Sequence, residues 1–294
     1  MISPPLAIVE REALGTCRGT VVALPGLAES ADCLQASADR WASDGFRVLA
    51  IDPRGHGNSP RWSTELLEKH PGDVIVDDII ETLQEVLITA DDRLLIFGHS
   101  AGGSTAAGVA ARLRNRVAGL ILEDPFWRLP VTPFQARNVA AAAATNLRRL
   151  QGMTDKDRRA EMAEMFPAWP ADEFAAWSSS KAKMDIALVE HGDVIPSRPW
   201  PVLLRDLADA HVPVLVLTGS VRIGMTPNHR AIIRSMGAEV VVLDGTSHFV
   251  RRDARGAFHE LADRYFARCA EAAGTSRSSG SAGGPASQRV LPSL

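Results

Sequence analysis

Cysteine is scarce in this sequence of 294 residues, and its scarcity excludes two kinds of protein. The three cysteines are Cys17, Cys33 and Cys269, an odd number spread along the chain. They therefore offer neither a disulfide framework nor the close pairing that a zinc site requires. We expect them to be reduced, buried thiols, and we predict neither a metal nor an organic cofactor.

An excess of one charge and long apolar runs are also missing. The 32 Lys and Arg residues nearly balance the 35 Asp and Glu residues, so the chain has no basic field that would attract nucleic acid. No apolar run reaches the length of a membrane span, and the first residues do not resemble a secretory leader. We therefore expect a cytoplasmic protein with no nucleic-acid or membrane partner. The sequence does not indicate an oligomeric state.

Short apolar runs alternate with stretches of helical spacing. Continuously apolar runs are typical of strands that are buried on both faces. The alternation predicts an α/β fold, in which a mostly parallel sheet has helices on both faces and functional groups at the carboxyl ends of its strands. The predicted strands are 20–24, 46–51, 93–97, 117–122, 214–218 and 240–243. The predicted helices between them are 32–44, 77–90, 100–114 and 227–236.

One long stretch breaks this alternation. Residues 126–200 contain Ala-rich and Glu/Met-rich helical segments separated by prolines, and no strand pattern. We predict a helical lid at 126–200, inserted in a core that comprises residues 1–125 and 201–270. Residues 271–294 are rich in Ser, Gly and Pro, which predicts a disordered tail.

Ser100 stands between a predicted strand and a predicted helix, in the pattern Gly-His-Ser-Ala-Gly. A serine in such a sharp turn adopts strained dihedral angles, and its neighbours Gly98 and Gly102 must lack bulk. The turn lifts the hydroxyl to the edge of the sheet and directs a helix N-terminus at it. The alternative is a serine that caps a helix after a glycine turn.

The motifs LPGLAES, IDPRGHGNS, GHSAGG and DGTSHFVRRD, together with the order of the predicted elements, resemble the α/β-hydrolase family over residues 20 to about 268. The resemblance implies the α/β-hydrolase fold with an inserted helical lid. It also implies Ser100 as a nucleophile, a backbone oxyanion hole and a histidine after the last strand. His56 lies in the second motif, a loop that resembles a structural element of the family; a binding role for His56 is the alternative.

A serine hydroxyl needs a base to act as a nucleophile at neutral pH. His248 follows the last predicted strand and is the natural base; the alternative is a loop histidine that caps Asp244 or the next helix. An oxyanion hole needs two backbone N–H groups. Ala101 supplies one, and the resemblance places the other at Leu27, where Pro and Gly replace the His-Gly pair of the family.

The acid that orients the histidine is where the sequence departs from the family pattern. Many relatives have an aspartate three residues after the glycine that ends the seventh strand, and here Arg222 stands at that place. Some relatives have the acid at the end of the sixth strand, where this chain has Glu123 and Asp124. We favour Asp124 because Pro125 would hold it extended at the start of the loop. Glu123 and a carboxylate of the lid or a loop remain alternatives.

The identity of the nucleophile indicates the chemistry, and a serine needs no metal or organic cofactor for it. Relatives that open epoxides or displace halides use an aspartate at the elbow, which leaves acyl transfer to water for Ser100. We predict a serine hydrolase that cleaves carboxylic esters of mainly apolar small molecules through an acyl-enzyme. The alternatives are a lactonase, a carbon–carbon bond hydrolase and a ligand-binding homologue without turnover.

Aromatic residues are concentrated in the predicted lid. Aromatic and Met side chains suit an adaptable apolar pocket, and we predict that Trp127, Phe134 and Trp177 bind the substrate. Ordinary packing of a small helical layer onto the core would produce the same composition.

Overall fold

The computed structural model describes residues 5–86, 93–128, 132–221 and 225–280. These residues form a seven-stranded sheet in the order β1-β3-β2-β4-β5-β6-β7. β1 is antiparallel to β3, and every other neighbouring pair is parallel. The strands are β1 (Ile8–Arg11), β2 (Thr20–Leu24), β3 (Arg47–Ile51), β4 (Leu94–His99), β5 (Val117–Glu123), β6 (Val214–Gly219) and β7 (Glu239–Leu243).

All six predicted strands are present, and β1 is the one that the sequence pattern missed. β1 is an edge strand with charged residues in its sequence, so it lacks the continuous apolar run of a strand buried on both faces. β2 and β4, at the centre of the sheet, are buried at every position. The mostly parallel α/β fold predicted from the sequence is confirmed.

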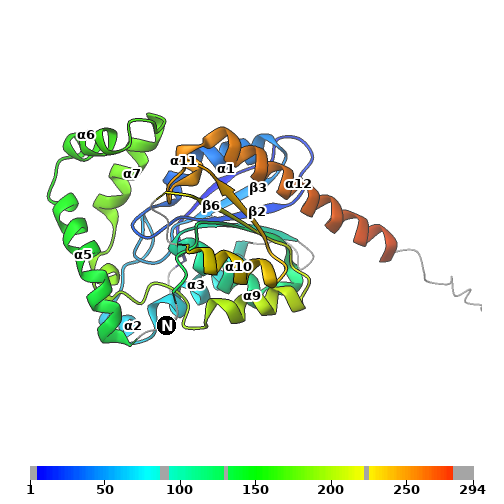
Figure 1. Cartoon of the computed structure of the whole chain (residues 1–294), viewed down its shortest axis with the longest axis horizontal. Coiled ribbons are helices and arrows are strands. Elements are labelled where there is room, and N and C mark those ends of the chain that lie inside the picture. The colour runs from blue at the N-terminus through cyan, green and yellow to red at the C-terminus, as the bar shows by residue number, and fades with distance from the viewer. Residues whose placement is uncertain (1–4, 87–92, 129–131, 222–224, 281–294) are drawn as a thin grey trace, which may run out of the picture.

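Helices cover both faces of the sheet (Figure 1). Alternate residues of β2 divide between two cores: Val22 and Leu24 pack with one set of helices, and Val21 packs with the other. The first set is α3 (Pro71–Val86), α4 (Ala101–Arg112), α9 (Trp200–Asp209) and α10 (Pro227–Ser235). The second set is α1 (Gln35–Ser43), α11 (Val250–Asp253) and α12 (Arg255–Gly280). Shorter helices are η1 (Ala31–Leu34), α2 (Thr64–Leu67) and η2 (Arg114–Arg116).

Between β5 and β6 the chain forms a helical insertion, as predicted. Figure 1 shows its first three helices grouped beside the α/β core. Thr132 and Thr154 begin the first two helices with side-chain caps. The insertion contains α5 (Pro133–Gln151), α6 (Asp155–Met165), α7 (Asp172–Lys183) and α8 (Ile186–His191). Its role as a lid and its exact limits stay predictions.

The C-terminal helix differs from the expected tail. α12 continues to Gly280, past residue 271, where the sequence predicts disorder to begin, because Ala and Glu residues at 270–273 favour helix. The remainder of the predicted tail, 281–294, lies outside the described residues. Cys17 is exposed in the loop between β1 and β2, so the expectation of three buried thiols is wrong at that position. No helix in the described ranges is both long and apolar enough to cross a membrane.

Candidate active site

Ser100 lies at the turn between β4 and α4, at the carboxyl edge of the sheet. Its backbone angles are φ 53° and ψ −121°, a conformation that strains any residue other than glycine. Main-chain hydrogen bonds hold this turn: the Ser100 amide donates to the Glu123 carbonyl at 2.9 Å, and the Ser100 carbonyl accepts from Phe126 at 2.9 Å. The turn therefore has the strain expected for a nucleophilic serine.

The glycines beside Ser100 are required by close backbone packing. A Cβ atom at Gly98 would lie 2.3 Å from the Gly102 carbonyl oxygen, and one at Gly102 would lie 2.2 Å from the Pro25 carbonyl oxygen. A Cβ atom at Gly26 would lie 3.3 Å from Cβ of Ser100. The loop that follows β2 is thus packed directly against the serine turn.

His248 and Asp124 form a close pair at the same edge of the sheet. His248 Nδ1 lies 2.5 Å from Asp124 Oδ2, and the Thr218 hydroxyl donates to Asp124 Oδ1 at 2.6 Å. Asp124 is fully buried, so its carboxylate depends on these partners. A proton on Nδ1 leaves Nε2 of His248 as the nitrogen that can accept one.

The backbone of Asp124 differs from the expectation based on Pro125. Asp124 is not extended but has φ 34°, in the left-handed region. Its amide donates to the Leu217 carbonyl at 2.8 Å, and this bond and the carboxylate contacts hold the unusual conformation.

Glu123, the alternative acid, has different partners. Its carboxylate accepts from the Arg251 amide at 2.6 Å and lies 3.6 Å from Nε of the same residue. Within the part of the chain that the structure describes, no hydrogen bond joins Glu123 to His248. Arg222, at the place where many relatives have the acid, lies outside the described residues.

The two predicted oxyanion donors lie in one region. Leu27 and Ala101 both line a small cavity, which Ser100 itself does not line but which begins at Ala101, the residue after it. Ala101 is the first residue of α4, where backbone amides have no partner within the helix and the dipole favours negative charge. Among the described residues, neither the Leu27 amide nor the Ala101 amide donates a hydrogen bond. Both are therefore available to an oxygen that develops negative charge.

A network of buried charges, which the sequence analysis missed, joins the Leu27 loop to the segment after His248. Glu29 accepts a hydrogen bond from Arg252 at 2.5 Å, and Arg252 also donates to Glu173 of α7 at 2.9 Å. Burial alone would raise the pKa of Glu29, but Arg252 and His99 lower it well below its usual value. Glu29 lies in the motif LPGLAES and Arg252 in the motif DGTSHFVRRD. Charged residues inside these two motifs were the sequence feature from which the network could have been predicted.

His99 lies between the two halves of this network. Its Nδ1 is 3.2 Å from the Glu29 carboxylate, which also accepts from the Gly26 amide at 3.3 Å. Its Nε2 is 3.2 Å from the His248 carbonyl oxygen. Burial opposes the charged ring, but Glu123 and Glu29 raise the pKa of His99. Both ring nitrogens thus lie within hydrogen-bond distance of an acceptor, so His99 connects the Leu27 loop to the main chain of His248.

The three aromatic residues predicted to bind substrate are not brought together. Trp127 is buried and stacks on Trp200 with ring centroids 4.9 Å apart. Trp177 packs in a separate cluster of the helical insertion with Trp169, whereas Phe134 is 67% exposed. None of the three lines the cavity beside Ser100. Packing of the helical insertion therefore accounts for two of them.

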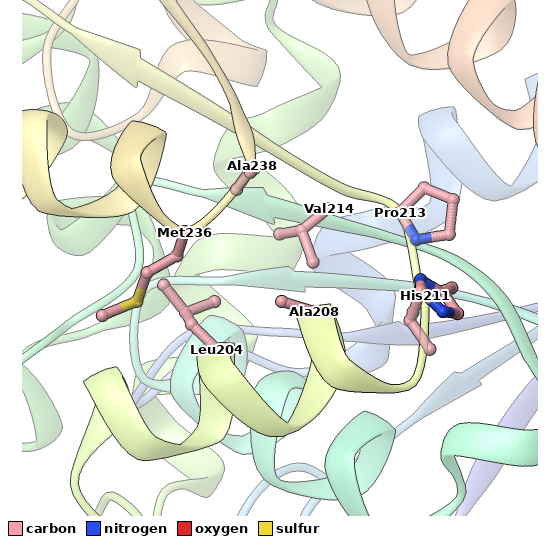
Figure 2. Close-up of a pocket in the computed structure, with 9 residues that line it drawn as sticks. Leu204, Ala208, His211, Pro213, Val214, Met236 and Ala238 are labelled. Carbon is pink, nitrogen blue, oxygen red and sulfur yellow. The ribbon is translucent and has the colours of Figure 1, made fainter.

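A larger cavity lies away from this site. Its volume is about 300 Å³, and Figure 2 shows its lining residues, including Leu204, Val214 and Met236, between α9 and the start of β6 and β7. The start of β6 is the edge of the sheet opposite to Ser100. Across the described ranges, no group of three His, Cys, Asp or Glu side chains is arranged to hold a metal ion.

Comparison with known proteins finds relatives over part of the chain. A protein of Mycobacterium phage D29 that carries the name of a non-heme haloperoxidase is 36% identical over 104 residues, which are 35% of this chain and 35% of that protein. A monoacylglycerol lipase of Mycolicibacterium smegmatis is 28% identical over 193 residues, which are 62% of this chain and 65% of the lipase. The chain thus matches less than two thirds of the length of either relative.

Structural similarity extends over almost the whole fold. An α/β superfamily hydrolase from Oenococcus oeni has a TM-score of 0.68 and 17% identity, over 92% of this chain and 98% of that one. The family model described as serine aminopeptidase, S33, matches residues 15–253. The chain therefore belongs to the serine aminopeptidase S33 family of α/β hydrolases.

Proposed function

We propose that the protein is a serine hydrolase that cleaves carboxylic esters of mainly apolar small molecules, with Ser100, His248 and Asp124 as its catalytic residues. The main support is the 2.5 Å pair of His248 and Asp124 at the sheet edge where Ser100 occupies a strained turn. The monoacylglycerol lipase among the relatives gives ester chemistry further support. We also propose a cytoplasmic location, from the charge balance and the scarce cysteines.

In the proposed reaction, His248 Nε2 takes the proton of the Ser100 hydroxyl as Ser100 Oγ attacks the ester carbonyl carbon. Asp124 stabilises the imidazolium that forms, because its carboxylate faces Nδ1. The tetrahedral intermediate then expels the alcohol, which receives its proton from Nε2. Water attacks the acyl-enzyme by the same steps and releases the carboxylic acid.

The negative charge on the carbonyl oxygen would be stabilised by the amides of Leu27 and Ala101. The N-terminus of α4 adds a favourable dipole at the same point. No step requires a metal or an organic cofactor.

Labelling with a fluorophosphonate probe, followed by turnover of p-nitrophenyl esters, tests this function. The wild-type protein should be labelled and should hydrolyse the esters, whereas Ser100→Ala should do neither. A folded wild-type protein that is not labelled would support a ligand-binding homologue instead. Lactones tested in parallel would separate an esterase from a lactonase.

A further inference from the structure

The cavity beside Leu27 and Ala101 combines an apolar lining with two polar side chains. The polar residues are His56 and Thr105, and each is only 3% exposed. The volume is about 10 Å³, close to the space that one water molecule occupies. The other lining residues are Pro25, Pro53, Ile75, Gly102, Leu188 and Val194.

His56 lines this cavity and carries a nitrogen that can accept a hydrogen bond. Its Nδ1 lies 3.1 Å from the Arg54 carbonyl oxygen, and since a carbonyl can only accept, Nδ1 carries the proton. Burial lowers the pKa of His56 to about 4, so the ring is neutral at pH 7 and Nε2 has no proton. Among the described residues, the contact of Nδ1 with Arg54 is the side-chain hydrogen bond found for His56.

Thr105 adds a hydroxyl to the same cavity. It lies on the first turns of α4, close after Ala101, and no side-chain hydrogen bond of Thr105 is found among the described residues. The hydroxyl of Thr105 and Nε2 of His56 can therefore bind a polar group that enters the cavity. An acceptor and a hydroxyl that share one small cavity therefore form a site for a group that donates and accepts.

The position of the cavity indicates which part of an ester would enter it. The departing alcohol must lie next to His248, which protonates it, and neither His248 nor any neighbour of it lines the cavity. The cavity instead begins at Leu27 and Ala101, whose amides would hold the carbonyl oxygen. It is thus on the side of the acyl chain.

We propose that this cavity is a subsite for a hydroxyl group on a short acyl chain, held by Nε2 of His56 and the hydroxyl of Thr105. The substrate hydroxyl takes the space of one water molecule, donates to His56 and accepts from Thr105, while the carbons of the acyl chain stay outside the cavity. The inference rests on the proposed serine hydrolase function and narrows its substrates to short hydroxyacyl esters.

The test compares p-nitrophenyl 3-hydroxybutyrate with p-nitrophenyl butyrate as the ratio of their kcat/KM values. For the wild-type protein, kcat/KM for the 3-hydroxybutyrate ester should be about 10-fold or more above that for the butyrate ester. The butyrate ester has no hydroxyl, so it leaves the polar groups of the subsite without a partner. His56→Asn retains a donor toward the Arg54 carbonyl but removes Nε2, and its ratio should fall to within about 2-fold of one. Thr105→Val, which preserves shape, should lower the ratio about 3-fold or more.

A matched control is Thr20→Val, at the opposite end of β2, which should keep the wild-type ratio. Fluorophosphonate labelling of Ser100 separates the two proposals. Labelling and hydrolysis of both esters with a wild-type ratio near one would overturn the subsite alone. No labelling and no hydrolysis would overturn the serine hydrolase function and the subsite with it.

A second pair of substrates separates the acyl side from the alcohol side. Glycerol monobutyrate and propyl butyrate differ only in hydroxyls on the alcohol, so His56→Asn should leave the ratio of their kcat/KM values unchanged. A ratio that depends on His56 only in this second pair would overturn the placement on the acyl side. If His56→Asn does not fold, Thr105→Val decides both comparisons, and unchanged ratios in it overturn the subsite.

Discussion

His56 should make the folded state lose stability as the pH falls from 7 to 5. Burial lowers the pKa of this histidine from 6.5 to about 4 in the folded protein, so the unfolded chain binds its proton first. Stability therefore decreases as pH falls, and the contribution of His56 is complete above pH 6.5 and lost by about pH 4. At pH 5 the loss is about 2 kcal/mol, out of about 3 kcal/mol at full protonation.

Urea unfolding of the wild-type protein and of His56→Asn, at pH 7 and at pH 5, measures this effect. The wild-type protein should lose about 2 kcal/mol more between the two pH values than the variant does. Other titrating groups, such as Glu29, His99 and His191, are present in both proteins and cancel in the difference. Equal losses in the two proteins would refute the reasoning that His56 is buried in its neutral form.

Three further predictions concern the catalytic turn and the acid. Ser100→Ala should lower kcat on any accepted ester by about 10⁴-fold or more. The variant should unfold like the wild-type protein, so that the loss reflects the missing hydroxyl. Near-parental turnover would exclude Ser100 as the nucleophile. Asp124→Asn should lower kcat by about 10²-fold or more with little change in KM. Glu123→Gln, which can still accept from the Arg251 amide but loses the negative charge beside the Arg251 side chain, should chiefly lower the free energy of unfolding. The reverse pattern would sink the assignment. Gly102→Ala should reduce both stability and kcat, because its Cβ atom would meet a carbonyl oxygen at 2.2 Å; wild-type values for both would show that the backbone can adjust.

The strands and the serine turn could be predicted because local sequence determines them. β2 and β4 are buried at every position, so their apolar runs mark them directly, whereas the edge strand β1 has no such signal. The small residues around Ser100 report a backbone conformation that the chain adopts locally. Choosing Asp124 over Glu123 was harder: both are buried, and only the three-dimensional arrangement decides which carboxylate meets His248.

The aromatic residues of the insertion show the limit of composition as a guide to binding. Apolar side chains that stabilise a small helical layer and those that line a pocket have the same chemistry, so their number cannot separate the two roles. Trp127 meets a tryptophan that lies far along the chain, and no periodicity indicates that contact. The cavity beside the serine turn is instead lined by short and medium side chains from several elements.

Charged residues that are buried predict contacts around the site better than aromatic composition does, provided that they are considered in pairs of opposite charge. Glu29 and Arg252 are buried, lie more than 200 residues apart in the sequence and meet at 2.5 Å, with Glu173 of α7 as a further partner of Arg252. An unpaired charge at either position would be costly to bury, so each one predicts that an opposite charge lies nearby, although the sequence does not say which. His99 then extends this pairing from Glu29 to the main chain of His248. The charged residues inside the motifs are thus best explained by the contacts they make, which hold the Leu27 loop and the His248 segment in fixed positions around Ser100.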